Sequence, residues 1–434
     1  MRSFGTDLPD PCSLALADRV HRSAFTDPRI FDIEMERIYG RLWIYVAHES
    51  EIAEPGCYKT TRIGTQPVIV SRTGRGELRV MLNACRHRAT TVCQSERGKA
   101  RHFICPYHGW AYDLEGNLVG VPGRQNQSRN FRESELGLVR LPKVASFRGF
   151  IFASFNTAIE PLEDYLGAAR QYLDYFVDLA PEGEIEFARA PNKYQYPGNW
   201  KQQIENALDG YHPAITHASF FKIVQERMGD PTAPVMQRFG YEASSPTQCR
   251  YLGNGHSLLD LRQVDRSQML GRGVPPGDEQ EFRARLKQRL GEEKAGELLS
   301  FRGGDGFNLL VYPNLILINV QIRVVFPIAP GRTEVHAYPT LLKGAPDPVN
   351  TARIRAHEDF YGPASLGAPD DMEMFARQWD GLQASSMEWL SYERGLDSEV
   401  QQGEQRVGQF TDETAHRGMW ARWRELMAGE GGRP

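Results

Sequence analysis

The 434 residues are 41% hydrophobic and 24% charged, which is ordinary for a globular chain long enough to form more than one domain. The formal net charge is -4 and the pI is near 6.3, so we expect neither nucleic acid nor a membrane as a partner. The sequence has no apolar run of about 18 residues and no signal-peptide pattern, which predicts a cytoplasmic protein. Six cysteines are too few for a disulfide framework, so a close Cys/His spacing indicates a metal site.

The N-terminal part of the chain divides into an arm and a β-rich domain. Residues 1–38 are polar and proline-containing, and we expect an arm that packs on a larger body, with a short helix over 30–39. Short β-patterned runs separated by glycines follow over 42–47, 58–63, 66–71 and 77–83. They predict an all-β domain over residues 39–156, closed by a strand at 149–155.

Two Cys/His motifs lie inside this β domain, Cys85-Arg-His87 and Cys105-Pro-Tyr-His108. Each motif offers one thiolate and one imidazole. Two of each are the ligands of a Rieske [2Fe-2S] centre, in which histidines replace two cysteines on one iron. Structural zinc uses the same ligand types. The Rieske centre is favoured because a zinc finger pairs Cys with Cys and His with His.

Residues 157–434 predict an α+β domain with an antiparallel sheet rather than a βαβ series. Helical patterns cover 162–179 and, with many charges, 278–301. Strand patterns lie between 308 and 342, and we expect the remainder of the chain to be helical.

The stretch 199–217 carries the strongest chemical signal of this domain. Its apolar residues recur at the spacing of a buried helix face: Trp200, Ile204, Leu208 and Tyr211. Asp209 and His212 fall on another face, and His217 follows just past a proline. Two histidines with one distant carboxylate would form the facial triad of a non-haem Fe(II) oxygenase. The alternative is a pair of buried core histidines.

The missing carboxylate is expected from the run Pro369-Asp370-Asp371-Met-Glu373, which opens a predicted helix. Asp370 and Glu373 have the spacing of a capping box, so we expect Asp370 to be the N-cap. Asp371 is then the favoured ligand, with Asp370 as the alternative. Two ordinary surface acids at a helix start remain the simplest interpretation.

These residues resemble the large (α) subunit of the Rieske non-haem iron aromatic-ring-hydroxylating dioxygenases, essentially from end to end. The resemblance is carried by the two Cys/His motifs, by Asn199-Trp-Lys, Glu205-Asn206 and Asp209-Gly-Tyr-His212 with His217, and by the run from Gly362 to Asp371. It implies that the second Asp of the pair binds iron with His212 and His217. It also implies that Asp209 is the bridging acid that hydrogen-bonds a Rieske histidine of the neighbouring subunit, and hence a ring-shaped oligomer.

The N-terminal run from Phe25 to Glu36 looks most like the benzoate, toluate, anthranilate and p-cumate branch. By resemblance, electrons from NADH pass through a reductase, with or without a ferredoxin, to the cluster and then to the iron. The oxygenase, an α3β3 assembly with a small β subunit, would use O2 to dihydroxylate an aromatic acid to a cis-diol. The alternatives are a Rieske monooxygenase (hydroxylase or demethylase) and a Rieske electron carrier.

Two residues are expected at the substrate. Arg323, within a strand-like run, suits a carboxylate because its guanidinium is a bidentate fork; an outward-facing strand residue is the alternative. Tyr361 aligns with an aromatic pocket position ahead of the Asp pair, and a packing role is equally compatible. The remaining histidines, His357 among them, have no useful partner spacing, so we expect packing roles for them.

Overall fold

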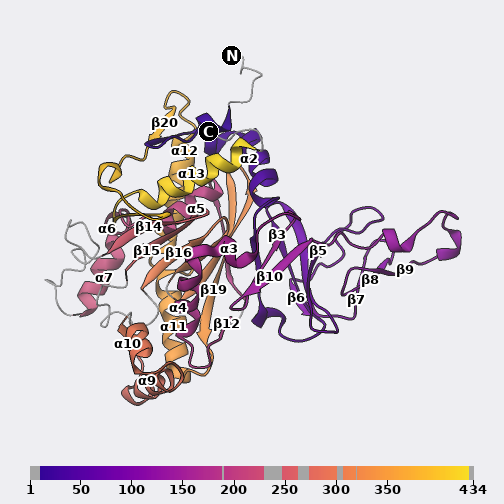
Figure 1. Cartoon of the computed structure of the whole chain (residues 1–434), viewed down its shortest axis with the longest axis horizontal. Helices are drawn as coiled ribbons and strands as arrows, with labels where there is room; N and C mark the ends of the chain where they lie inside the picture. The colour runs from indigo at the N-terminus through magenta and orange to yellow at the C-terminus, as the bar shows by residue number, and fades with distance from the viewer. Residues whose placement is uncertain are drawn as a thin grey trace. The chain divides into compact units, whose positions relative to one another are not determined.

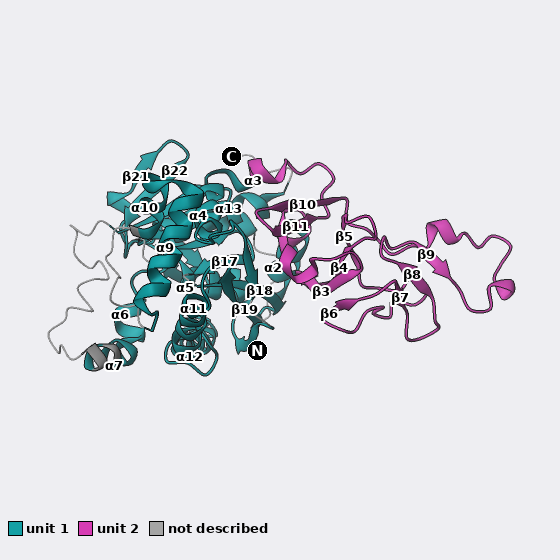
Figure 2. Cartoon of the chain, turned by 90° about the horizontal axis from the view of Figure 1, so that it is seen from below, with its two compact units in different colours: residues 1–38, 166–434 teal, residues 39–165 magenta. Residues whose placement is uncertain are grey.

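The computed structural model describes residues 10–187, 190–228, 247–261, 273–300, 306–318 and 320–429. The chain forms two compact units, which Figure 2 shows in different colours. One unit is continuous and covers Tyr39–Tyr165. The other combines Met1–Ile38 with Leu166–Pro434. Among the described residues, no helix is long and apolar enough to cross a membrane.

The Tyr39–Tyr165 unit is built from three small antiparallel sheets, as expected for an all-β domain. Their strand orders are β5-β4-β3-β6, β10-β11-β2 and β7-β8-β9. Short helical turns η3, η4 and η5 cover Glu49–Ile52, Arg124–Asn126 and Glu133–Glu135, and the helix α3 at its end covers Leu162–Leu166. The strands are β2 Ile44–His48, β3 Cys57–Ile63, β4 Gln66–Arg72, β5 Leu78–Leu82, β6 Arg97–Lys99, β7 His102–Ile104, β8 Ala111–Asp113, β9 Leu118–Gly120, β10 Lys143–Phe147 and β11 Phe150–Ser154.

The second unit is organised around an antiparallel ten-stranded sheet (Figure 1). The order is β12-β19-β18-β17-β16-β15-β14-β22-β21, and β13 also pairs with β19. A separate small sheet joins β1 Arg19–His21 to β20 Trp389–Ser391. The strands of the large sheet are β12 Ile185–Phe187, β13 Asn192–Pro197, β14 Gln248–Gly253, β15 His256–Asp260, β16 Phe307–Val311, β17 Leu315–Ile318, β18 Gln321–Ala329, β19 Arg332–Leu342, β21 Val400–Gln402 and β22 Gln405–Gln409.

The helices of this unit differ from the predicted ones in two places. The expectation of an all-helical end of the chain is wrong, because β20, β21 and β22 lie there. The charged helix is interrupted at Gly291, which has a positive φ of 81°. The helices are η1 Pro11–Ser13, α1 Ser23–Thr26, α2 Pro28–Glu34, η2 Met35–Tyr39, η6 Gly167–Ala169, α4 Arg170–Asp178, α5 Trp200–Ala207, α6 Pro213–Thr216, α7 Ala218–Met228, α9 Pro276–Leu290, α10 Glu292–Ser300, α11 Asp347–Phe360, α12 Ala368–Gly381, η8 Leu396–Ser398 and α13 Thr414–Ala428.

One face of the large sheet lies against α5, and we call it the site face. The Asn308 side chain on β16 donates to the carbonyl of Ala207 at 3.0 Å, so Asn308 points at α5. Alternate residues of a strand, and residues directly opposite each other on neighbouring strands, share a face. Leu310 is two residues after Asn308, and the register continues across the sheet from it: Leu310 opposite Ile316, Ile316 opposite Arg323, and Arg323 opposite Ala337. Arg323 is therefore on the site face.

A buried charge network joins α5 to both ends of the chain. The carboxylate of Glu34, which is completely buried in α2, accepts hydrogen bonds from Trp200 Nε1 at 2.9 Å and from Lys201 Nζ at 2.5 Å. Trp423 Nε1 on α13 donates to the same carboxylate at 2.7 Å. Because a buried charge without a partner is costly, these contacts fix α5 against α2 and α13.

Candidate metal centres and active site

The first Cys/His motif of the β domain lies on the loop between β5 and β6, and the second lies on the loop between β7 and β8. Cys85 and Cys105 are buried in a hydrophobic cluster that includes Tyr112 and Trp110. His87 and His108 are exposed, and their Nδ1 atoms face each other at 3.1 Å. The His87 ring is stacked on Trp110, with centroids 5.0 Å apart. The thiols thus lie on the buried side of the site and the imidazoles on its solvent side.

This separation fits a two-iron cluster better than one zinc ion. A tetrahedral zinc ion would hold its four ligand atoms within about 4 Å of one another. In the described part of the chain, the only group of three or more potential ligands that meets within 4.8 Å is a different one, formed by His212, His217 and Asp371. The Nδ1 separation of His87 and His108 suits two ligands of one iron, with the thiols left for the other iron.

Tyr112 on β8 is placed to adjust the electron affinity of such a cluster. Its hydroxyl lies 3.3 Å from Cys85 Sγ and accepts a hydrogen bond from the Arg86 amide at 3.1 Å. Since the hydroxyl oxygen already accepts from that amide, its own proton is available to the sulfur. Burial, followed by the hydrogen bond with Cys85, raises the pKa of Tyr112, so the hydroxyl keeps this proton.

We expect Tyr112→Phe to lower the midpoint potential of the cluster by about 40–60 mV, because one hydrogen bond of roughly 1 kcal/mol to a sulfur stabilises the more negative, reduced cluster. A redox titration followed by circular dichroism measures this shift. Tyr107→Phe is the matched control, because Tyr107 is exposed and packs on His108 rather than on a sulfur. Equal potentials in the Tyr112 variant and the wild type would contradict the tuning role.

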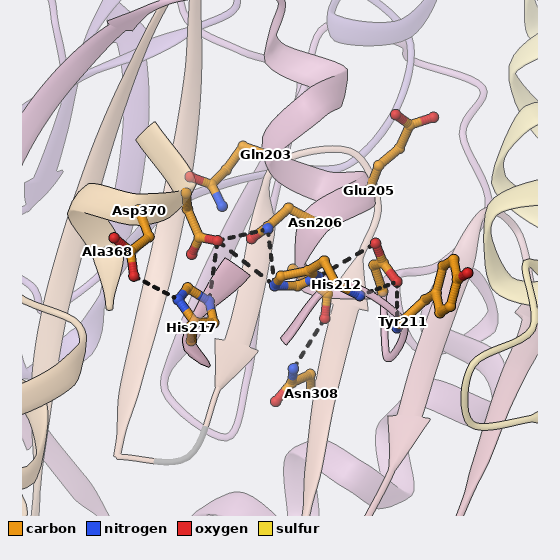
Figure 3. A network of polar contacts seen from close by, with 12 residues as sticks. Gln203, Glu205, Asn206, Tyr211, His212, His217, Asn308, Ala368 and Asp370 are labelled. Carbon is orange, nitrogen blue, oxygen red and sulfur yellow. Dashed lines mark hydrogen bonds and ion pairs between the residues drawn. The ribbon is translucent and has the colours of Figure 1, made fainter. Parts of the chain in front are cut away.

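A second cluster of metal-binding groups lies beside α5, as Figure 3 shows. His217 Nε2 is 3.2 Å and His212 Nε2 is 3.6 Å from the same oxygen, Oδ1 of Asp371. His217 and Asp371 are buried, and His212 is partly buried. Two imidazole nitrogens and one carboxylate oxygen converging on a point form the donor set of a facial triad, which leaves coordination positions open.

The other ring nitrogen of each histidine faces a carboxylate. His212 Nδ1 is 3.3 Å from Asp209 Oδ2, and His217 Nδ1 is 3.3 Å from Asp370 Oδ2. Such carboxylates hold the proton on Nδ1 and leave Nε2 free to bind a metal. The arrangement therefore fits a bound iron in both its ligands and their supports.

Asn206 completes the cluster, and the sequence did not indicate its role. Its side-chain Nδ2 donates to Asp371 Oδ1 at 3.0 Å and lies 3.3 Å from His212 Nε2. It occupies the last turn of α5, close to the convergence point of the ligands (Figure 3). Only the family resemblance, through the pair Glu205-Asn206, pointed to this residue.

Two predictions about local structure are wrong. The helix expected through Tyr211 ends at Ala207, and Tyr211 is 50% exposed rather than part of a buried stripe. Asp209 and His212 thus meet in a turn, where Asp209 Oδ1 also accepts from the Tyr211 amide at 2.6 Å. A glycine is needed at 210 because a Cβ there would collide with the carbonyl of Phe410.

The second wrong prediction is Asp370 as the N-cap of α12. The N-cap residue is Gly367, and Asp370 lies inside the first turn. Asp370 therefore does not cap the helix and instead reaches His217. Glu373, the expected partner in the capping box, pairs with Arg377 at 2.8 Å, one turn further along the helix.

Neighbouring groups of the site keep the carboxyl groups of Asp371 and Asp209 ionised. Burial raises the pKa of Asp371, but the hydrogen bond from His217 and the charges of His217, His212 and Arg323 outweigh it and hold this pKa below its usual value. For Asp209, burial is likewise outweighed by the His212 contact, which lowers the pKa to about 2. Asp209 is thus a carboxylate at neutral pH and accepts hydrogen bonds.

The two expected substrate residues lie together near this site. Arg323 is 3% exposed on β18, which excludes the outward-facing alternative. Its guanidinium carbon lies 5.5 Å from the centre of the Tyr361 ring, a cation–π distance. Tyr361 is the residue immediately after α11 and is partly buried.

Family models match most of the chain. Residues 42–147 match the Rieske [2Fe-2S] domain, and residues 163–429 match the catalytic domain of the ring-hydroxylating α subunit. The second match alone covers more than half of the sequence.

Relatives and solved structures agree with the domain matches. The chain is 38% identical to the large subunit of anthranilate 1,2-dioxygenase from Acinetobacter baylyi, over 87% of this chain and 80% of that one. It is 35% identical to the large subunit of 2-halobenzoate 1,2-dioxygenase from Burkholderia cepacia, with the same coverage. The crystal structure of naphthalene 1,2-dioxygenase from Rhodococcus sp. bound to indole superposes with a TM-score of 0.80, at 28% identity over 95% of each chain. This chain therefore belongs to the Rieske non-haem iron ring-hydroxylating dioxygenases, as a large (α) subunit with a [2Fe-2S] cluster and a mononuclear iron.

Proposed function

We propose that this subunit dihydroxylates the ring of an aromatic carboxylate to a cis-diol. Arg323 is the observation that carries the substrate class. Across the described residues, this buried guanidinium has no ion pair, and its Nε lacks a hydrogen-bond partner. A buried cation without a counter-ion is costly, whereas a substrate carboxylate supplies both the charge and two acceptors. The named activities of the anthranilate and halobenzoate relatives, which act on aromatic acids, support this class.

The place of Arg323 in the sheet suits this role. It lies on the site face, toward which α5 also faces, and its charge is one of those that act on Asp371. The Tyr361 ring beside the guanidinium offers an aromatic surface at the same point. In the proposed complex, the carboxylate pairs with Arg323 and the substrate ring packs near Tyr361.

In the proposed division of the chain, residues 39–156 carry the cluster on Cys85, His87, Cys105 and His108, and residues 157–434 carry the iron on His212, His217 and Asp371. When bound, these groups supply electrons and activate O2. The protein side chains hold the ligands in their tautomers, exclude water around Asp371 and orient the acid. An NADH-dependent reductase, with or without a separate ferredoxin, is the proposed electron source.

We further propose that Asp209 accepts a hydrogen bond from a Rieske histidine of a neighbouring α subunit, in an α3β3 assembly with a small β subunit. Exposed groups support this contact on both sides. Tyr211, stacked on Arg394, and Ile215, at 76% exposure, surround the Asp209 turn. His87 and His108 are exposed in the β unit, beside the exposed Tyr107. Each unit thus presents an accessible aromatic and polar surface.

A single turnover of the reduced holoprotein with isotopically heavy O2 tests the reaction. The substrates are benzoate, anthranilate, 2-chlorobenzoate and 3-methylbenzoate, with benzamide as the uncharged comparison. We expect both heavy oxygens in a diol formed from at least one acid and little product from the amide. Incorporation of a single heavy oxygen would instead indicate a monooxygenase.

Replacing Arg323 with leucine tests the substrate class. We expect the acid to bind about 10–100-fold more weakly, because a charge-assisted hydrogen bond contributes about 1.5–3 kcal/mol. The substrate-free protein should unfold at the same or a higher temperature, since an unpaired buried cation is replaced by an apolar side chain. Calorimetric titration and thermal denaturation measure the two effects.

Arg323→Lys is the matched variant, because it keeps the charge but not the bidentate fork. It should bind the acid more weakly than wild type and more tightly than the leucine variant. If the wild type and Arg323→Leu bind the acid equally well, Arg323 does not bind the substrate carboxylate. The argument for an acid substrate then fails.

A further inference from the structure

A second buried donor lies near Arg323. His357 on α11 is completely buried. Its Nε2 lies 3.0 Å from Asn192 Nδ2, and Asn192 Nδ2 is also 3.2 Å from Glu358 Oε1. Because a carboxylate only accepts hydrogen bonds, the contact with Glu358 fixes which end of the Asn192 amide is the donor. Asn192 therefore donates to His357 Nε2.

This contact determines where the proton of the imidazole lies. Nε2 accepts from Asn192, and the next carboxylate oxygen, on Glu358, is 3.9 Å away and too distant for a hydrogen bond. In the neutral ring the proton must then be on Nδ1. Burial, and next the charge of Arg323, lower the pKa of His357 to about 4, so the ring is neutral at neutral pH. His357 thus presents one N–H, at Nδ1.

That N–H is buried and has no hydrogen-bond partner in the part of the chain that the structure describes. Buried donors without an acceptor are rare in folded proteins, and each one asks for an explanation. The unpaired Nε of Arg323 is another donor of this kind. One anion with two acceptor oxygens would satisfy both donors.

The sheet register places Arg323 and Asn192, the residue that contacts His357, on the same face. Asn192 on β13 is opposite Ala337 on β19, and Ala337 is opposite Arg323 on β18. These three side chains therefore form a row on the site face, with neighbouring strands about 4.8 Å apart. His357 contacts Asn192, at one end of the row. Arg323 is at the other end, and its positive charge lowers the pKa of His357.

We propose that His357 donates its Nδ1–H to the substrate carboxylate that Arg323 holds, so that the two residues form one carboxylate receptor. The assignment rests on the proposed function of Arg323. Arg323 supplies the charge, and the neutral His357 supplies a directed donor that fixes the plane of the carboxylate. Asn192 and Glu358 act through His357 by setting its tautomer. They are positioning residues.

Calorimetric titration of the oxidised holoprotein tests the assignment with two probes, anthranilate and 2-isopropylaniline. The isopropyl group has a shape similar to the carboxylate but no charge and no acceptor. We expect His357→Leu to weaken the binding of anthranilate about tenfold or more and to leave 2-isopropylaniline within about twofold. His357→Asn should recover most of the affinity, because the Asn Nδ2 takes the place of the His Nδ1 donor.

A matched control is His336→Leu. His336 is on the neighbouring strand β19 but is opposite Val324, so it lies on the other face of the sheet, where it pairs with Glu334 at 2.8 Å. Its replacement should leave the binding of both probes unchanged. Asn192→Leu, which leaves His357 in place but frees its tautomer, should weaken anthranilate alone and decides the question if His357→Leu does not fold.

The outcomes separate the two proposals. If Arg323→Leu weakens anthranilate and neither His357→Leu nor Asn192→Leu does, His357 is not part of the receptor, and the role of Arg323 stands. If the wild type binds both probes equally, or if Arg323→Leu has no effect, the proposed function fails first. An equal loss for both probes in His357→Leu would reduce His357 to a packing residue.

Discussion

Alanine at position 371 is expected to remove the mononuclear iron while leaving the cluster in place. The iron content should fall from about three to about two per chain, with an unchanged visible spectrum of the cluster. Asp371 Oδ1 is the atom that both histidine Nε2 atoms face, so its removal takes away one of the three proposed ligands. Since the loss of a supporting hydrogen bond alone costs about 10–100-fold in metal affinity, the loss of a ligand should cost more than about 100-fold. Product formation should be lost with the iron.

The neighbouring acid provides the matched control. Asp370 lies 3.3 Å from His217 Nδ1 and supports the ligand rather than contributing an oxygen to the convergence point. Asp370→Ala should therefore weaken iron binding about 10–100-fold, and added Fe(II) should restore activity. Metal analysis at several Fe(II) concentrations distinguishes the two. The reverse pattern, with iron lost only in the Asp370 variant, would show that the ligand had been assigned to the wrong acid.

Asp209→Asn is expected to leave both metals bound and to slow electron transfer between the cluster and the iron at least about tenfold. The amide oxygen of asparagine still accepts from the Tyr211 backbone, so the turn should keep its shape. The negative charge is lost, and with it the strong acceptor for His212 and for the proposed histidine of the neighbouring subunit. The rate at which the reduced cluster is reoxidised in the presence of O2 and substrate measures the effect.

Asp370→Asn separates a bridging role from simple support of a ligand. Both acids contact the Nδ1 of an iron-site histidine at 3.3 Å, and both are partly exposed. If Asp209 bridges two subunits, only the Asp209 variant should reoxidise its cluster slowly. Equal slowing in both variants would mean that each acid merely orients a histidine, and the bridging proposal would be withdrawn.

The proposed metal-binding motifs could be predicted from the sequence because each is local. The Cys and His residues of the β domain lie in two short loops, and His212 and His217 lie at the two ends of the short helix α6. The choice of Asp371 over Asp370 agrees with the group that the structure brings together, but its capping argument is wrong, because Gly367 is the N-cap. The family resemblance was the sounder basis for that choice.

Other features depend on long-range contacts that no local pattern contains. The turn after α5 brings Gly210 against Phe410, which is 200 residues away, so closely that a Cβ at position 210 would collide with it. The tautomer of His357 depends on Asn192, 165 residues earlier. Burial of Arg323 follows from the register of β17, β18 and β19, since an alternating pattern alone does not say which face is covered.

The discontinuous unit has a consequence for the order in which the protein assembles during synthesis. Residues 39–165 are contiguous and can fold as soon as they leave the ribosome, whereas the iron-binding unit needs segments from both ends of the chain. The hydrogen bond from Trp423 to the Glu34 carboxylate can form only after Trp423 has been synthesised. At about 5–20 residues per second, this is roughly 15–50 s after the β unit has emerged. Cluster insertion can therefore precede iron binding. A chain truncated before α13 should acquire the brown colour of the cluster but no stable mononuclear iron.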